Sequence, residues 1–287
     1  MRDCLIFLHL PKAAGTTIHV LLDRLFPADE IYTIASPEML RSFRAFAALP
    51  ETERGRYRVL RGHMPFGIHR HVPGRGRYFT ILREPVARVI SMYHYTRRMP
   101  VHYLHERVHG EDMSLADYVA GRLTTEIDNG QTRLLSGRLD AYVTVEDGAI
   151  REPAVAFGEC TPTMLEEARQ NLAKHFEVVG LCERFPETFM LLRQAFGWPL
   201  RTYARANVSA RSSPREPTPP EVVERIRECN RFDFELYEYG RELFRDQLAR
   251  WGTPERRALA WHRLLQRARR VAAAVTRPGR RLVRRLA

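Results

Sequence analysis

Apolar residues gather along this chain in short continuous runs, and stretches with helical periodicity lie between them. Such runs are typical of strands buried in a parallel sheet. The predicted strands are residues 4–8, 30–34, 56–62, 77–83 and 176–181. Apolar positions spaced three and four residues apart predict helices over 18–25, 37–48, 84–97, 115–123, 164–175, 185–196 and 219–248.

The order of these elements predicts an α/β fold, an open parallel sheet flanked by helices. The chain begins with a strand, a turn of small residues and a helix, which is a P-loop-like arrangement. With 287 residues, it suits one large domain over 1–250 and an appendage over 251–287. The appendage is predicted to be a basic C-terminal helical tail, and 204–220 a proline-rich loop.

The net charge of +12 comes mostly from the tail. Residues 254–287 contain eleven arginines and one acid, which leaves a charge of only +2 for 1–253. The high positive charge is therefore informative about the binding partners of the tail and not about those of residues 1–253. Only Lys12 and Lys174 among the 46 basic residues are lysines. A lysine at position 12 indicates that an ammonium group is needed there, although an ordinary surface lysine is the alternative.

The turn after the first predicted strand has the chemistry of an anion site. The first turn of a helix presents backbone N–H groups and the positive end of the helix dipole. Threonine hydroxyls and the lysine ammonium would add further donors. The predicted anion-binding residues are Lys12, Ala13, Ala14, Gly15, Thr16 and Thr17. Because the lysine precedes the glycine, the turn does not match the nucleoside triphosphate loop GxxxxGK[ST].

A second anion site is predicted where the strand over 77–83 passes into a helix. Arg83 closes the strand, and Ser91 lies two helical turns later, where its hydroxyl can face back toward the strand end. A guanidinium fork and a hydroxyl suit a phosphate monoester. Ligands of open parallel sheets bind at the carboxyl ends of strands, so Lys12, His63 and Arg83 are expected in one cleft. Two anion sites indicate a ligand with two separated anionic groups.

The four cysteines are scattered without metal-ligand spacing, which predicts reduced thiols and a cytoplasmic location. The first strand starts almost at the N-terminus, so no signal peptide is expected. No apolar run is long enough for a transmembrane helix. His102, His105 and His109 lie close in sequence, but no carboxylate or cysteine joins them at a persuasive spacing. No metal site is therefore predicted.

In its two anion motifs the chain resembles the sulfotransferases that use 3′-phosphoadenosine 5′-phosphosulfate (PAPS). HLPKAAGTT, residues 9–17, looks like their 5′-phosphosulfate loop, and LREPVARVISMYHY, residues 82–95, looks like their 3′-phosphate motif. The resemblance is closest to the carbohydrate-directed branch, which includes the heparan and dermatan 2-O-sulfotransferases. It extends to about Leu248, with RGHMPF, DNGQTRLLSG, FEVVGLCERFPETFMLLRQAFGW and NRFDFELYEYGRELF as supporting stretches.

This resemblance implies sulfonate transfer from PAPS to a hydroxyl of a carbohydrate or glycolipid, without a metal. Lys12 would contact the sulfonate and the bridging oxygen, and the amides of residues 13–17 would surround the 5′-phosphate. Arg83 and Ser91 would hold the 3′-phosphate, and residues 207–209 would lie in a segment covering the donor. The departure at Ala13 and Ala14, where the family has threonine or glycine, leaves the backbone cradle in place.

His63 matches the general base of the 2-O-sulfotransferases. A sugar hydroxyl must lose its proton as it attacks sulfur, and a neutral imidazole is a suitable acceptor near neutral pH. A strand-end histidine that bonds only to the backbone is the alternative. Two further hypotheses stay open for the whole chain. One is a P-loop-type small-molecule kinase, and the other is a noncatalytic lipid- or nucleic-acid-binding protein that acts through its tail.

The tail carries one apolar helical stripe with arginines around it. The stripe consists of Trp261, Leu264, Leu265, Ala268, Val271, Ala272 and Val275. A basic amphipathic helix can lie on an anionic membrane, which would place the protein peripherally at the inner face. It can equally pack against the main domain. No specific nucleic acid is expected as a partner.

Overall fold

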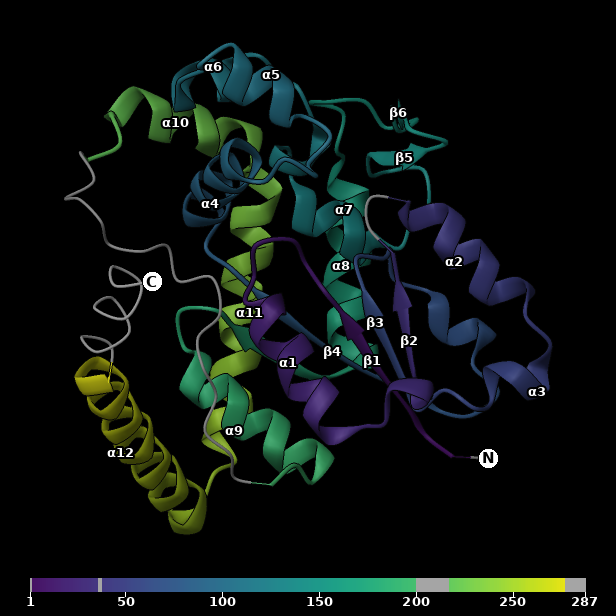
Figure 1. Ribbon diagram of the computed structural model, residues 1–287, viewed down its shortest axis with the longest axis vertical. Helices are drawn as coiled ribbons and strands as arrows, with labels where there is room; N and C mark the ends of the chain where they lie inside the picture. Colours follow the sequence, from purple (N-terminus) through teal and green to yellow (C-terminus); the bar gives the residue numbers. More distant parts are fainter. Residues whose placement is uncertain (1, 36–37, 200–216, 277–287) are drawn as a thin grey trace, which may run out of the picture.

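The computed structural model describes residues 2–35, 38–199 and 217–276 of the chain. Within these residues, a five-stranded parallel sheet has the strand order β2-β3-β1-β4-β7 (Figure 1). Its strands are β1 (Cys4–Leu8), β2 (Ile31–Ile34), β3 (Val59–Gly62), β4 (Gly76–Leu82) and β7 (Phe176–Leu181). The predicted parallel α/β sheet is thereby confirmed.

The bounds of β2 and β4 differ from the predicted ones by one residue at one or both ends, and two other differences are larger. β3 begins at Val59 rather than at residue 56, because the preceding residues close turns after helix α3 (Glu51–Arg54). Arg56 N–H donates to the carbonyl of Glu53, and Tyr57 N–H donates to that of Arg54. A separate antiparallel hairpin, β5 (Thr144–Glu146) with β6 (Ala149–Arg151), was not predicted.

Helices fill most of the remaining described chain. The α-helices are α1 (Gly15–Leu25), α2 (Met39–Ala48), α3 (Glu51–Arg54), α4 (Pro85–Arg98), α5 (His105–Gly110), α6 (Leu115–Ala120), α7 (Gly130–Ser136), α8 (Pro162–His175), α9 (Phe185–Phe196), α10 (Pro220–Cys229), α11 (Arg231–Ala249) and α12 (Thr253–Thr276). Short 3₁₀ turns are η1 (Ala28–Glu30), η2 (Ile68–His71) and η3 (Thr125–Ile127). The loop predicted over 204–220 and the segment 207–209 lie mostly or wholly outside the described residues.

The prediction of a single helix over 219–248 is wrong. The helix is interrupted at Asn230, which separates α10 from α11. Asn230 is fully buried, and its side-chain amide donates to the carbonyls of Ile127 and Ile226 at 2.8 and 2.9 Å. A buried side-chain amide needs hydrogen-bond partners, and backbone carbonyls can supply them. Here these two bonds hold Asn230 in a conformation that is not helical. Because of this interruption, α11 need not continue along the axis of α10.

Helices cover both faces of the sheet. On one face, Phe79 of β4 stacks on Phe7 of β1 with ring centroids 4.7 Å apart, and it also contacts Phe196 at the end of α9. Helices α1 and α9 lie over this face, as Figure 1 shows. On the other face α11 approaches closely, since a Cβ on Gly240 would come within 2.1 Å of Leu82. Only a glycine there allows that packing.

A buried ionic network ties three helices together at the carboxyl side of the sheet. Asp233 of α11 is fully buried, and its carboxylate accepts hydrogen bonds from the backbone N–H groups of Gln131 and Thr132 at the start of α7. It also accepts from the Thr132 hydroxyl at 2.8 Å and from the buried guanidinium of Arg88 on α4 at 3.3 Å. The DNGQTRLLSG segment is therefore a structural junction.

Helix α12 packs on α9 through a different face from the predicted apolar stripe. The buried side chain of His262 stacks on Phe189, with ring centroids 5.0 Å apart, and Arg263 pairs with Glu187 at 2.7 Å. Trp261 and Leu264 from the stripe are each 55% exposed. The stripe residues Val271, Ala272 and Val275 lie outside the described side chains.

The predicted domain boundary at residue 250 falls between α11 and α12, and the neighbouring Trp251 belongs to the main core. None of the described helices, α12 included, has the length and apolar character needed to cross a membrane.

Replacing Asp233 with alanine should lower the free energy of unfolding by about 3–5 kcal/mol, because the guanidinium of Arg88 would be left buried without its partner. Urea denaturation followed by circular dichroism measures this loss. The matched control is Glu242→Ala on the same helix. Glu242 forms an exposed pair with Arg245 at 3.9 Å, and its removal should change stability by less than about 1 kcal/mol. Equal effects of the two substitutions would contradict the role given to Asp233.

Candidate functional site

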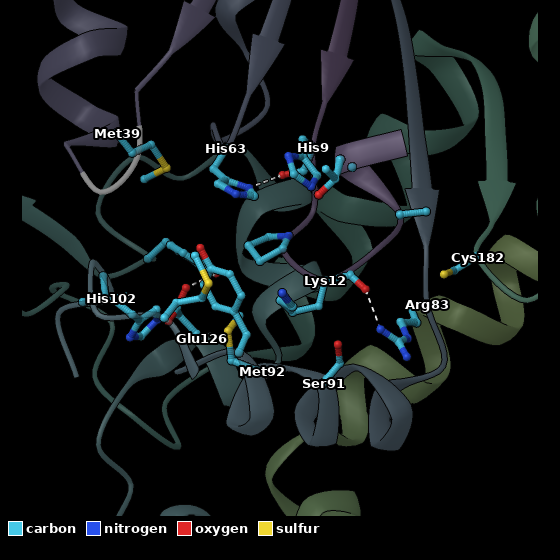
Figure 2. Close-up of a pocket in the computed structure, with 18 of the residues that line it drawn as sticks. His9, Lys12, Met39, His63, Arg83, Ser91, Met92, His102, Glu126 and Cys182 are labelled. Carbon is cyan, nitrogen blue, oxygen red and sulfur yellow. Dashed lines mark hydrogen bonds and ion pairs between the residues drawn. The ribbon is translucent and has the colours of Figure 1, made fainter. Parts of the chain in front are cut away.

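A cavity of about 940 Å³ lies at the carboxyl ends of the central strands. Lys12 reaches it from the turn after β1, His63 from the end of β3 and Arg83 from the end of β4 (Figure 2). Adjacent parallel strands deliver their following residues to the same edge of a sheet, which explains why these three side chains meet. Ser91 enters from α4 beside Arg83.

The turn between β1 and α1 is built as a compact loop. Lys12 and Ala14 have positive φ angles of 67° and 61°, a left-handed conformation that non-glycine residues adopt only where the surroundings enforce it. Gly15 is required next, because a Cβ there would lie 1.6 Å from Nε2 of His9. These constraints turn the loop so that residues 14–17 line the cavity.

Not every residue predicted for the anion loop faces the cavity. The Ala13 side chain is buried, and its N–H donates to the carbonyl of Leu10 at 3.2 Å. Thr17 lines the cavity, but its N–H donates to the carbonyl of Ala14 at 3.1 Å. Among the predicted residues, Lys12, Ala14, Gly15, Thr16 and Thr17 line the cavity and Ala13 supports it from behind.

Arg83 is held from two sides. Its Nη1 donates to the carbonyl of Lys12 at 2.8 Å, which joins the second anion motif to the first. Its backbone forms two hydrogen bonds of 3.0 Å with the side-chain amide of Gln131, one at its N–H and one at its carbonyl. The position of Arg83 therefore depends on α7. Gln131 is a supporting residue that the sequence did not single out, although it lies in a stretch that contributed to the family resemblance.

The ammonium group of Lys12 lies 3.6 Å from the centre of the Tyr95 ring, a cation–π contact. Burial lowers the pKa of Lys12 to about 8, with the charges of Arg98 and Arg83 acting in the same direction and that of Glu126 opposing them. At neutral pH the group is mostly charged. An anion that enters the cavity would meet a partly desolvated cation, for which electrostatic attraction is stronger than in water.

His63 is oriented by the backbone. Its Nδ1 lies 2.7 Å from the carbonyl oxygen of His9, so Nδ1 carries the ring proton and donates it, and Nε2 is left as an acceptor. Burial lowers the pKa of His63 below its ordinary value of 6.5, although the hydrogen bond to His9 and the charge of Glu126 oppose this. The imidazole is thus neutral at pH 7 and can take up a proton.

The far wall of the cavity carries a polar cluster that the sequence analysis did not identify. Glu126 of η3 accepts a hydrogen bond from the hydroxyl of Tyr103 at 3.0 Å and lies 3.4 Å from Nε2 of His102. Figure 2 shows Glu126 and His102 on the opposite side of Lys12 from Arg83. A lone acid in an irregular segment leaves no sequence signal, and only the fold brings Glu126 to the cavity.

The other two histidines considered for a metal do not join this cluster. His105 bonds through Nδ1 to the carbonyl of Thr96 at 2.9 Å, and its ring stacks on that of His109. Over the described ranges, no three histidine, cysteine or acidic side chains gather as metal binding would need.

Comparisons with known proteins bear on the family. The family model described as Galactose-3-O-sulfotransferase matches residues 1–285. The chain is 29% identical over 273 residues to galactose-3-O-sulfotransferase 3 of Homo sapiens, which covers 86% of this chain and 57% of that relative. It is 29% identical over 228 residues to heparan-sulfate 6-O-sulfotransferase 2 of Danio rerio, covering 72% and 46% of the two chains.

A shorter match of 106 residues, also 29% identical, relates 36% of the chain to 19% of the protein-tyrosine sulfotransferase of Arabidopsis thaliana. The chain spans a little over half the length of the galactose-3-O-sulfotransferases it matches. The resemblance to carbohydrate-directed sulfotransferases is confirmed, and the matching model specifies the galactose-3-O branch. The chain belongs to the galactose-3-O-sulfotransferase family.

Proposed function

We propose that this protein transfers the sulfonate group of PAPS to a hydroxyl of a carbohydrate acceptor. The observation that carries the proposal is the convergence of Lys12, His63 and Arg83, from three strand ends, on one cavity. The cavity is lined by the cations Lys12, Arg83 and Arg98 and by the neutral His63, whose Nδ1 is bonded to the backbone so that Nε2 can accept a proton. Such a site suits an anionic donor beside a hydroxyl that must lose a proton.

In this proposal the loop of residues 14–17 and Lys12 hold the 5′-phosphosulfate, and Arg83 with Ser91 holds the 3′-phosphate. His63 accepts the proton of the attacking hydroxyl at Nε2 while the new O–S bond forms. The bond between sulfur and the bridging oxygen breaks, and Lys12 stabilises the charge that grows on the departing phosphate. The products are the sulfated acceptor and adenosine 3′,5′-bisphosphate. The step balances without a metal.

The acceptor that we propose is a galactoside, because galactose is named in the relatives that cover most of the chain, and methyl β-galactoside serves as the test compound. As a narrower proposal, the acceptor is a glycolipid that carries this sugar. A P-loop-type kinase is less well supported, since Lys12 precedes Gly15 and the order of a nucleotide triphosphate loop is missing. Stabilisation by magnesium-ATP that equals or exceeds that by adenosine 3′,5′-bisphosphate would favour the kinase.

His63→Ala should reduce turnover with PAPS and methyl β-galactoside by about 10²–10⁴-fold, the usual contribution of a general base. Affinity for adenosine 3′,5′-bisphosphate should stay nearly unchanged, because His63 faces the acceptor. Transfer of labelled sulfonate and calorimetric titration measure the two quantities. His109→Ala is the matched control, since His109 is exposed and does not line the cavity. A folded His63→Ala protein with normal turnover would assign the base to another group.

The pH dependence of kcat/KM for PAPS should show an alkaline limb set by Lys12. The ammonium is charged below its pKa of about 8 and neutral above it, so kcat/KM should fall as pH rises through that value. In Lys12→Arg the guanidinium stays charged, and the fall near pH 8 should disappear even if turnover is lower. An unchanged alkaline limb in Lys12→Arg would show that another group controls it.

For α12 we propose peripheral binding to an anionic membrane surface. Trp261 and Leu264 are exposed on a helix that also presents Arg256, Arg257 and Arg267 to solvent. Apolar side chains between arginines suit the interface of an anionic bilayer. The cytoplasmic location and the inner face of the membrane stay predictions from the sequence, as does a main domain that ends near residue 250.

Trp261 can report on this binding, because the other two tryptophans, Trp198 and Trp251, are buried. Vesicles with anionic lipid should shift the tryptophan emission to the blue, and vesicles of neutral lipid should not. The double substitution of Trp261 and Leu264 by serine should lower vesicle partitioning in sedimentation by at least about tenfold. Leu139→Ser, at an exposed leucine away from α12, is the control. Equal partitioning of both variants would reject the proposal.

A further inference from the structure

Glu126 is an acid in a cavity whose other charged groups are mostly cations. It is 9% exposed and lines the cavity together with Lys12, Arg83 and Arg98. In a chain with 46 basic residues, an arginine or lysine partner would be expected for a buried carboxylate. Among the described residues, however, the ion-pair partner found for Glu126 is His102.

The partners of Glu126 are arranged to hold an ionised carboxylate in place. The amide of Leu104 donates to Nδ1 of His102, so the ring proton of a neutral His102 lies on Nε2, which faces Glu126. The hydroxyl of Tyr103 donates to Oε2 of Glu126 and also lies 2.7 Å from the hydroxyl of Thr124. These contacts fix the orientation of the carboxylate.

Burial by itself would raise the pKa of Glu126. Hydrogen bonds from His102 and Tyr103, together with the nearby rings of His102 and His63 when they are protonated, nevertheless hold that pKa below its ordinary value of 4.5. The group is therefore a carboxylate at neutral pH.

This carboxylate retains acceptor capacity. Two ionised oxygens offer about four acceptor positions. Oε2 accepts the hydrogen bond of Tyr103 at 3.0 Å and lies 3.4 Å from Nε2 of His102, and Oε1 accepts a hydrogen bond of 3.4 Å from the hydroxyl of Tyr142, so these three contacts leave acceptor positions on the carboxylate. An acceptor-only group that lines a cavity is suited to ligands that donate hydrogen bonds, and a sugar presents several hydroxyl donors.

The position of Glu126 in the cavity indicates which ligand its carboxylate would contact. Arg83 and Ser91 lie on one side of Lys12, and Glu126 lies on the other (Figure 2). A carboxylate would repel the phosphates of the donor, so the Glu126 side suits the uncharged acceptor. Glu126 lines the same cavity as Lys12 and His63, the two groups proposed for the chemistry.

We propose that Glu126 binds the acceptor sugar by accepting a hydrogen bond from a hydroxyl next to the one that is sulfated. Tyr103 and His102 are positioning residues that act through Glu126. This inference rests on the proposed function and assigns the side of the cavity opposite to the donor site. Hydrogen bonds of hydroxyls to carboxylates are charge-assisted, so the contact would contribute strongly to acceptor affinity and orientation.

The test measures binding of methyl β-galactoside and its four monodeoxy analogues to the protein loaded with adenosine 3′,5′-bisphosphate, by NMR titration. Glu126→Gln keeps the size of the side chain but removes its charge. We expect it to weaken binding of the parent glycoside by about 10–100-fold, as for loss of a hydrogen bond to a charged group. For the analogue that lacks the contacted hydroxyl, the variant and the wild type should bind equally.

Glu177→Gln is the matched control. It removes the same charge from a carboxylate that pairs with Arg77, outside the cavity, and should leave glycoside binding unchanged. A Glu126→Gln protein that binds the parent glycoside normally would overturn the proposal. So would a variant that weakens all five ligands equally, because a merely structural glutamate would do that.

The failure of this inference can be distinguished from failure of the proposed function. Lack of sulfonate transfer by the wild type, despite glycoside binding that depends on Glu126, would reject the proposed reaction and retain the binding role. Sulfonate transfer by the wild type, with glycoside binding that does not depend on Glu126, would support the proposed reaction and reject the binding role of Glu126. If the wild type bound none of the glycosides, the role of Glu126 would be rejected.

Discussion

The buried carboxylate of Asp233 is the constraint on which the candidate site depends. It accepts hydrogen bonds from the start of α7 and from Arg88, and so fixes α7 against α4 and α11. Gln131 of α7 in turn holds the backbone of Arg83, whose guanidinium bonds to the carbonyl of Lys12. A continuous series of hydrogen bonds thus connects the core of the protein with both anion motifs. Such support keeps binding groups in position before a ligand arrives, which reduces the entropy lost on binding.

The sequence predicted the parallel sheet because each strand has a local signal. The bounds of β1 and β7 agree with the predicted runs, since β1 is a continuous apolar segment and β7 is interrupted only by Glu177 and Gly180. Long-range contacts determined two of the features that were missed. The break at Asn230 follows from a bond to the carbonyl of Ile127, 103 residues away. The packing face of α12 was selected by Phe189 and Glu187 of α9 rather than by its own apolar stripe.

In the candidate site, too, some residues could be predicted from local sequence patterns and others could not. Lys12, His63 and Arg83 could be assigned to one cleft because all three follow strands, and the ends of parallel strands meet at one edge of the sheet. Glu126 and Gln131 could not be assigned, because no spacing connects them with the strand ends. His102 was recognised only as a possible metal ligand, whereas its contact with Glu126 gives it a different role. Local patterns therefore revealed the groups proposed for the donor, and tertiary structure revealed those on the opposite side.

The two sides of the cavity also differ in where they come from. Lys12 and Arg83 follow the ends of strands β1 and β4, whereas Ser91, Glu126 and Tyr142 belong to the long connection between β4 and β7. A change in that connection can reshape one wall of the cavity while the strand order stays intact. The strand ends that carry Lys12 and Arg83 can thus stay in place while residues such as Glu126 and Tyr142 differ. This architecture is compatible with relatives whose names specify galactose, heparan sulfate and protein tyrosine as their substrates.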